Sequence, residues 1–121
     1  MMFKKYFTPQ EAKKRLPLIK QIVQDILGKG QRLKILADEY KGREPPVEYH
    51  RLTSQIEVLI LELEDLGCFF KDWNFEIGLV DFPAMIADQE VFLCWRSDEV
   101  EISFYHPIQE GYSSRRPIPY F

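Results

Sequence analysis

Two stretches of the chain carry apolar or small residues at alternating spacings of three and four, and this pattern constrains the fold more than any other feature. The first stretch covers residues 16–40 and the second covers residues 49–66. Such spacing lines side chains along one helix face, and its repetition over several turns is typical of coiled-coil helices. We therefore expect two long helices. Their apolar series are Leu16, Ile19, Val23, Ile26, Gly30, Leu33, Ala37 and Tyr40, then Tyr49, Leu52, Ile56, Leu59, Leu63 and Leu66.

Capping and turn residues indicate where both helices begin and end. Thr8-Pro9-Gln10-Glu11 is a helix start, because the threonine can cap, the proline suits the first helical position and the glutamate stands at the capping-box position. Gly42 and Pro45-Pro46 prevent the first helix from continuing, and Gly67 ends the second. Two heptad helices with a short connection form an antiparallel hairpin, which the sequence places at residues 8–66.

Three residues disturb the regularity of the first helix. Pro17 lies too deep in the helix to be neutral, so we expect a kink or a short separate first helix there. Gly28 and Gly30 each cost about 1 kcal/mol of helix propensity relative to alanine. We expect these glycines to permit a close approach between helices or a local bend.

After the second helix, the spacing of apolar residues changes to the alternation of β-strands. Ser97-Asp98-Glu99 is predicted as a hairpin turn, and residues 107–121 as an extended tail. The chain is thus predicted to be one α+β domain of residues 1–121, in which the hairpin precedes a small antiparallel sheet at residues 68–106. The strand candidates are residues 68–71, residues 78–83 ending at their proline, residues 90–96 and residues 100–106.

The composition excludes several classes of protein. A net charge of -3 and a pI near 5.4 do not fit a nucleic-acid-binding protein, which is normally basic. The sequence has no run of about 18 apolar residues and no apolar signal-peptide core, so we expect no membrane span and a cytoplasmic location. Cys68 and Cys94 have neither metal-clip spacing nor the density of a disulfide scaffold, and we expect both to be buried thiols.

The small net charge hides an uneven distribution. Residues 1–43 carry a charge of +7, whereas residues 44–105 carry -11. We expect these two segments to attract each other, either within the fold or across a dimer. The end of the second helix, residues 62–65, is acidic where the helix dipole disfavours negative charge. Either the basic residues 13–15 compensate this charge, or the acidic face is solvated.

Several short elements are distinctive enough to compare with known families. The chain opens with Phe7-Thr8-x-x-Glu11-Ala12, and later carries Gly78-Leu79-Val80-Asp81-Phe82-Pro83-Ala84 and Leu93-Cys94-Trp95. Together these elements, spread over nearly the whole chain, resemble a small prokaryotic family known only as a domain of unknown function. The resemblance implies membership and no activity, so the function has to be argued from the residues.

The polar residues of the second half are the candidates for a functional site. Asp81 stands out because apolar residues flank it, and a buried carboxylate is costly unless it is paired or binds a cation. One interpretation is that Asp81 and His106 converge with a glutamate as a metal site or an acid/base pair. The other is that they are satisfied internally, by a backbone amide, an arginine or each other. The candidate cluster comprises Asp72, Asp81, Glu90, Glu99 and His106.

Two further features have a functional and a structural interpretation. Arg115 and Arg116 follow a serine-rich turn and could hold a phosphate or carboxylate, although such pairs are more often solvated or salt-bridged. Cys94 lies inside an apolar strand, whereas a nucleophile would need exposure and a depressed pKa. We therefore interpret Cys94 as a packing residue.

The sustained apolar series and the lack of a recognisable catalytic set favour a non-catalytic interaction or assembly module over an enzyme. We expect a homodimer formed through the helical hairpins, with no nucleic-acid or membrane partner and no cofactor. The alternative is a small metal- or anion-binding domain or enzyme, built on Asp81 and His106 with a nearby glutamate and Arg115 or Arg116. A divalent metal, if one binds, would be held by Asp81 and His106.

Overall fold

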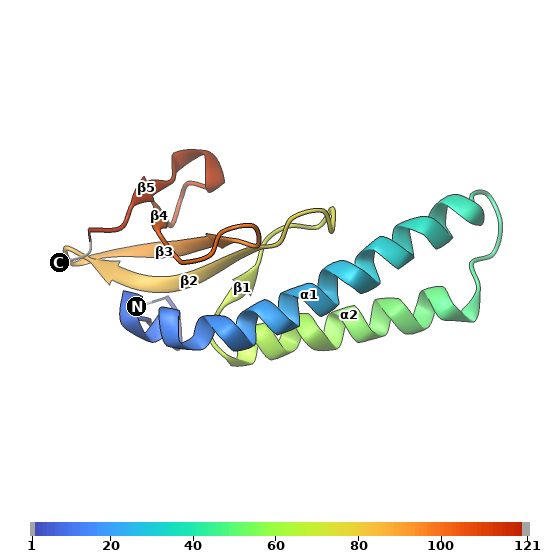
Figure 1. The fold of residues 1–121 in the computed structure, drawn as a ribbon, viewed down its shortest axis with the longest axis horizontal. Helices are drawn as coiled ribbons and strands as arrows, with labels where there is room; N and C mark the ends of the chain where they lie inside the picture. Colours follow the sequence, from blue (N-terminus) through green and yellow to red (C-terminus); the bar gives the residue numbers. More distant parts are fainter. Residues whose placement is uncertain (1, 120–121) are drawn as a thin grey trace.

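The computed structural model describes residues 2–119 and shows two antiparallel helices followed by a five-stranded sheet (Figure 1). The helices are α1 (Pro9–Glu39) and α2 (Val47–Asp65), so the predicted hairpin is confirmed. Thr8 and Glu11 form the expected capping box: Thr8 Oγ1 accepts from the Glu11 amide at 3.1 Å, and Glu11 Oε1 accepts from the Thr8 amide at 3.2 Å. This pair fixes the start of α1.

Helix α1 continues through Pro17, so a separate first helix does not form. Proline removes one backbone hydrogen bond, to the carbonyl four residues earlier. Pro17 and Lys13 are both exposed, so water can bind the carbonyl that the proline leaves free. The proline is thus tolerated because it lies on the solvent side of α1, a placement that depends on which face the sheet covers.

Gly30 lies directly against an aromatic side chain. A Cβ placed on Gly30 would lie 2.1 Å from Cγ of Phe75, which comes from the loop between the first two strands. Gly42 and Gly67 end their helices with φ angles of +76° and +96°, a region that glycine adopts without strain.

The sheet is antiparallel throughout, and its strands lie side by side in sequence order. The longest pair, β2 and β3, forms a hairpin whose turn residues Ala87 and Asp88 have φ angles of 50° and 64°, as a two-residue turn of the primed type requires. The strands are β1 (Phe69–Phe70), β2 (Leu79–Ile86), β3 (Gln89–Arg96), β4 (Phe104–Pro107) and β5 (Arg116–Pro117).

Strand β2 does not end at its proline, contrary to the prediction from the sequence. The carbonyl of Pro83 accepts a hydrogen bond from the Phe7 amide at 2.7 Å, so this edge of the residue faces the N-terminal segment. In a strand, the nitrogen and the carbonyl of one residue point to the same side. The nitrogen of Pro83 therefore points away from β3, and its missing N–H removes no hydrogen bond from the β2–β3 ladder.

The last part of the sheet also differs from the prediction. The expected turn forms after β3, where the Glu99 amide donates to the Arg96 carbonyl at 2.8 Å, but the connection continues to residue 103 because β4 begins only at Phe104. The expected extended tail contains a 3-10 turn, η1 (Tyr112–Ser114), and strand β5, which pairs with β4. Residues 120 and 121 of that tail lie outside the described part of the chain.

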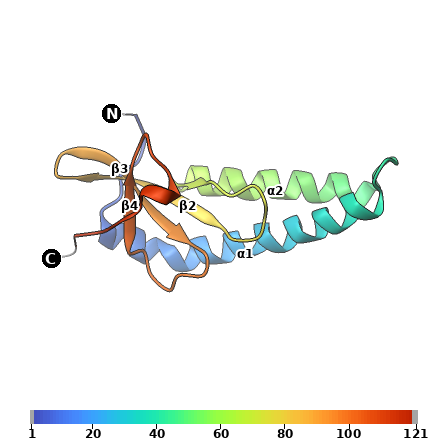
Figure 2. The same cartoon turned by 90° about the horizontal axis from the view of Figure 1, so that it is seen from above.

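One face of the sheet packs on the first half of α1, which runs beneath it (Figure 2). The remainder of the hairpin extends past the sheet (Figure 1), and only Ile56 and Leu63 of α2 are fully buried. Within residues 2–119, no helix has the length and apolarity needed to cross a membrane. The core residues from the two layers include Ala12, Leu16, Ile19, Val23 and Ile26 from α1, and Val80, Phe82, Ala84, Val91, Leu93 and Trp95 from the sheet.

Candidate functional site

Three chemically reactive side chains meet on the sheet face that points away from the helices. Asp81 on β2 is the direct cross-strand partner of Cys94 on β3. His106 on β4 pairs with Phe92, two residues along β3 from Cys94, so strand alternation places it on the same face. We call Asp81, Cys94 and His106 the central cluster.

The central cluster is closely spaced and almost completely removed from solvent. A carboxylate oxygen of Asp81, the sulfur of Cys94 and a ring nitrogen of His106 all lie within 4.8 Å of one another. The three residues are 4%, 1% and 3% exposed, respectively. Nε2 of His106 lies 3.3 Å from Oδ1 of Asp81, so the two ionisable groups satisfy each other. This contact is the internal pairing that the sequence left open as one alternative.

The protonation of His106 is shifted by its surroundings. Burial lowers its pKa, but hydrogen bonds to Asp81, to Cys94 and to the Pro107 carbonyl outweigh burial and raise the pKa from 6.5 to about 10. Nδ1 of His106 lies 2.9 Å from the Pro107 carbonyl oxygen. Since a carbonyl only accepts, Nδ1 carries a proton, and the ring presents Nε2 to Asp81.

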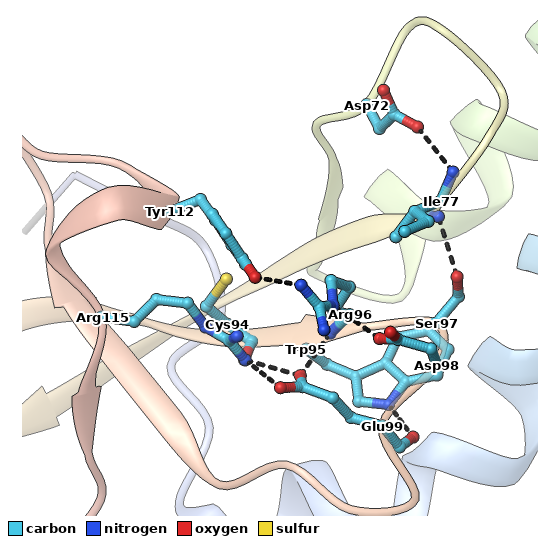
Figure 3. Close-up of polar contacts among 11 residues, drawn as sticks. Asp72, Ile77, Cys94, Trp95, Arg96, Ser97, Asp98, Glu99, Tyr112 and Arg115 are labelled. Carbon is cyan, nitrogen blue, oxygen red and sulfur yellow. Dashed lines mark hydrogen bonds and ion pairs between the residues drawn. The ribbon is translucent and has the colours of Figure 1, made fainter.

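A second polar group, the Arg115–Glu99 pair, adjoins the central cluster (Figure 3). Nη2 of Arg115 donates to both carboxylate oxygens of Glu99, at 2.5 and 2.7 Å, and to the carbonyl of Cys94 at 3.1 Å. The guanidinium also lies 4.2 Å from the centre of the Phe104 ring. Nε of Arg115 is buried without a hydrogen-bond partner among the described residues. The arginine thus fixes the backbone that carries Cys94.

Glu99 organises the loop after β3 as well. Its carboxylate accepts from the Arg96 amide at 2.8 Å, and its carbonyl accepts from the Trp95 indole nitrogen at 2.9 Å. The Arg96 guanidinium bonds Asp98 at 2.5 Å and also the hydroxyl of Tyr112 (Figure 3). These contacts stabilise the turn that follows β3.

The other predicted site residues lie outside the central cluster. Asp72 accepts from the amides of Asn74 and Ile77 at 3.0 and 3.3 Å and so stabilises the loop before β2. Glu90 accepts from the hydroxyl of Tyr6 at 2.5 Å, at the far end of β3. Arg116 is 3.9 Å from Glu110 and more than half exposed, so the two adjacent arginines bind different carboxylates. Of the candidates, Asp81 and His106 meet, with Glu99 and Arg115 beside them.

Cys94 was interpreted from the sequence as a packing residue, and its position in the central cluster was missed. The feature of the sequence that could have placed Cys94 opposite Asp81 is the turn between β2 and β3. A two-residue turn at Ala87-Asp88 fixes the register and places Asp81 opposite Cys94. Neither turn residue is glycine or asparagine, so the usual sequence mark of such a turn is lacking.

The exposed side of the hairpin is a second feature with functional potential. On α2, Val58 and Leu61 are 56% and 58% exposed, although they lie on a helix with a buried face. Val47 and Ile35, near the far end of the hairpin, are 73% and 50% exposed. Single exposed apolar residues are ordinary, but those of α2 follow helical spacing and form a stripe.

The molecule is therefore an α+β domain with a projecting hairpin and a buried Asp–Cys–His cluster. Residues 5–118 match a family described as "Uncharacterized conserved protein (DUF2203)", and the chain belongs to this family. The predicted membership in a family of unknown function is confirmed. Comparisons with curated proteins and with solved structures gave no match.

Proposed function

We propose that the protein is a non-catalytic, self-associating module whose hairpin pairs with the hairpin of a second copy. The observation that carries this proposal is the outer stripe of α2, which we define as Val47, Ser54, Val58 and Leu61. These residues are exposed and follow helical spacing on the side opposite the buried Ile56 and Leu63. Helix α2 carries apolar residues on two opposite faces, and only one of these faces is buried within the chain. The other face is therefore available to a further partner.

The charges of the two helices favour a second copy as that partner. Helix α1 carries seven Lys/Arg against four Asp/Glu, whereas α2 carries one against five. In a symmetric pair of hairpins, α2 of each copy can lie along α1 of the other, and opposite charges then face each other.

The acidic end of α2 supports this arrangement. Among the described residues, Glu57, Glu62, Glu64 and Asp65 form no ion pair, so the basic residues 13–15 do not neutralise them within the chain. The ion pair that does join the two helices is Arg32–Glu48, at 3.0 Å. A second copy would bring further cations to this uncompensated acidic surface.

The expected dimer is concentration dependent. Burying the exposed parts of Val58 and Leu61 is worth about 1 kcal/mol each, taking roughly half of a full Val or Leu burial. Association costs several kcal/mol, so the remaining contacts along both helices are needed for affinity. We place this module in the cytoplasm, which agrees with two free, buried cysteines.

The test is the molar mass in solution, measured by analytical ultracentrifugation over a hundredfold range of protein concentration. Wild type is expected to approach twice the chain mass at high concentration. Val58→Lys combined with Leu61→Lys is expected to remain monomeric, because it removes the stripe while retaining helix propensity. Val100→Lys is the matched control, since Val100 is 81% exposed but lies in the loop after β3. A wild-type monomer throughout, or a dimer unaffected by the α2 substitutions, contradicts the proposal.

A further inference from the structure

The donor atoms of the central cluster are arranged as the ligands of a metal ion would be. Its donor atoms come from three adjacent strands, β2, β3 and β4, which are tied together by backbone pairing. Ligand atoms around a tetrahedral zinc ion are roughly 3–4 Å apart, given metal–ligand bonds of about 2.0–2.3 Å. The 3.3 Å between His106 Nε2 and Asp81 Oδ1 already fits, and the 4.8 Å limit for the whole cluster requires only small side-chain shifts.

The orientation of His106 is also that of a metal ligand. Histidines that bind metals usually donate their other ring N–H to a carbonyl or carboxylate, which fixes the tautomer and the ring plane. Here Nδ1 lies 2.9 Å from the Pro107 carbonyl, and Nε2 is directed at Asp81. The ring of Phe92 packs edge-on against the imidazole, with centroids 5.6 Å apart, and further restricts it.

A cation and its carboxylate partner hold the strand segment that carries Cys94. The Arg115 guanidinium donates to the carbonyl of Cys94 at 3.1 Å, and this places a cation beside the residue. Glu99 in turn holds that guanidinium. Arg115 and Glu99 are thus positioning residues for the cluster and not ligands.

We propose that Asp81, Cys94 and His106 bind one late first-row divalent ion of the Zn²⁺ type. A carboxylate oxygen, a thiolate sulfur and an imidazole nitrogen form a mixed donor set that suits zinc and its neighbours, whereas Mg²⁺ and Ca²⁺ prefer oxygen ligands alone. Binding releases the Nε2 proton of His106 and the thiol proton of Cys94 to solvent, and the carboxylate and thiolate then balance the charge of the ion. Within residues 2–119, no fourth His, Cys, Asp or Glu joins the group, so a small exogenous ligand or water takes the remaining position. This site is independent of hairpin self-association.

Cobalt(II) is the probe of choice, because a thiolate–cobalt bond gives a charge-transfer band and a tetrahedral site gives intense visible bands. Protein freed of metal by unfolding and refolding in chelator is titrated with Co²⁺. Wild type is expected to bind one ion per chain with the thiolate band, to lose the band when Zn²⁺ is added, and to keep it in excess Mg²⁺. The absence of a thiolate band in folded wild type overturns the proposal without any variant.

The two cysteines provide a matched control, since both are buried thiols in one chain. Cys94→Ala is expected to abolish the thiolate band, whereas Cys68→Ala retains it. Asp81→Asn is expected to weaken Co²⁺ binding at least tenfold and to retain the thiolate band at saturating ion. Circular dichroism checks that each variant is folded. A band that survives Cys94→Ala, or that disappears in folded Cys68→Ala, places the ion elsewhere and overturns the assignment.

Discussion

Gly28 and Gly30 stand two residues apart in α1 but face different surroundings, and this difference gives a sharp test of the packing. A Cβ on Gly28 meets nothing within 4 Å, whereas one on Gly30 would lie 2.1, 2.3 and 2.5 Å from atoms of Phe75. Both substitutions to alanine gain the same helix propensity, about 1 kcal/mol. Gly28→Ala should therefore raise the free energy of unfolding by about that amount.

Gly30→Ala must displace Phe75, which packs against the hydrophobic core while remaining partly exposed. Forcing an extra carbon into a packed contact costs about 1–3 kcal/mol, which offsets or exceeds the gain in propensity. The two alanine variants should thus differ by about 2 kcal/mol in urea unfolding at one protein concentration. For a chain of this size, that difference corresponds to roughly 8 °C in melting temperature.

A double-mutant cycle identifies Phe75 as the cause. In a Phe75→Ala background, Gly30→Ala has no ring to displace and should stabilise the protein as Gly28→Ala does, so the coupling free energy is about 2 kcal/mol. Equal stabilisation by Gly28→Ala and Gly30→Ala while Phe75 is present would refute the reasoning. A coupling below about 0.5 kcal/mol would do the same.

Three further predictions concern single contacts. Thr8→Ala should lower the free energy of unfolding by about 1 kcal/mol, because it removes the side-chain acceptor of the α1 capping box; a loss below about 0.3 kcal/mol in urea unfolding contradicts this role. Burial raises the pKa of the Cys68 thiol from 9.0 to about 12, so the folded state retains a proton that the unfolded state loses. Wild type should accordingly lose stability relative to Cys68→Ala as the pH rises from 9 towards 12, and a pH-independent difference contradicts it. Arg115→Ala should cost about 3 kcal/mol because it leaves the largely buried Glu99 without its cationic partner, whereas Arg116→Ala, at an exposed contact, should cost less than about 0.5 kcal/mol; equal losses refute the distinction.

Local sequence patterns predicted the helical half of the fold. The start at Thr8, the stops at Gly42 and Gly67, and the hairpin between them depend on neighbours within one or two helical turns. A spacing of three and four residues is enough to indicate which face of a helix is buried. Of the kink or separate first helix expected at Pro17, the separate helix did not form, because tolerance of a proline depends on the exposure of its side of the helix.

The sheet was predicted less completely, because its register and edges depend on distant residues. The carbonyl of Pro83 binds the Phe7 amide, and Glu99 holds the start of the connection to β4 through contacts with Trp95 and Arg96. Strand alternation gives each residue a face but does not say which residues of other strands lie beside it. Without the register of β2 and β3, nothing in the sequence placed Cys94 opposite Asp81.

The sequence by itself determined the α+β layout, the helical hairpin and the choice of Asp81 and His106 as the notable polar pair, because periodicity, capping and the cost of a buried carboxylate are local properties. Only the tertiary structure decided that these two side chains meet, that Cys94 joins them and that Glu90 does not. Their convergence depends on strand pairing between residues that are far apart in sequence, and local patterns do not encode those distances.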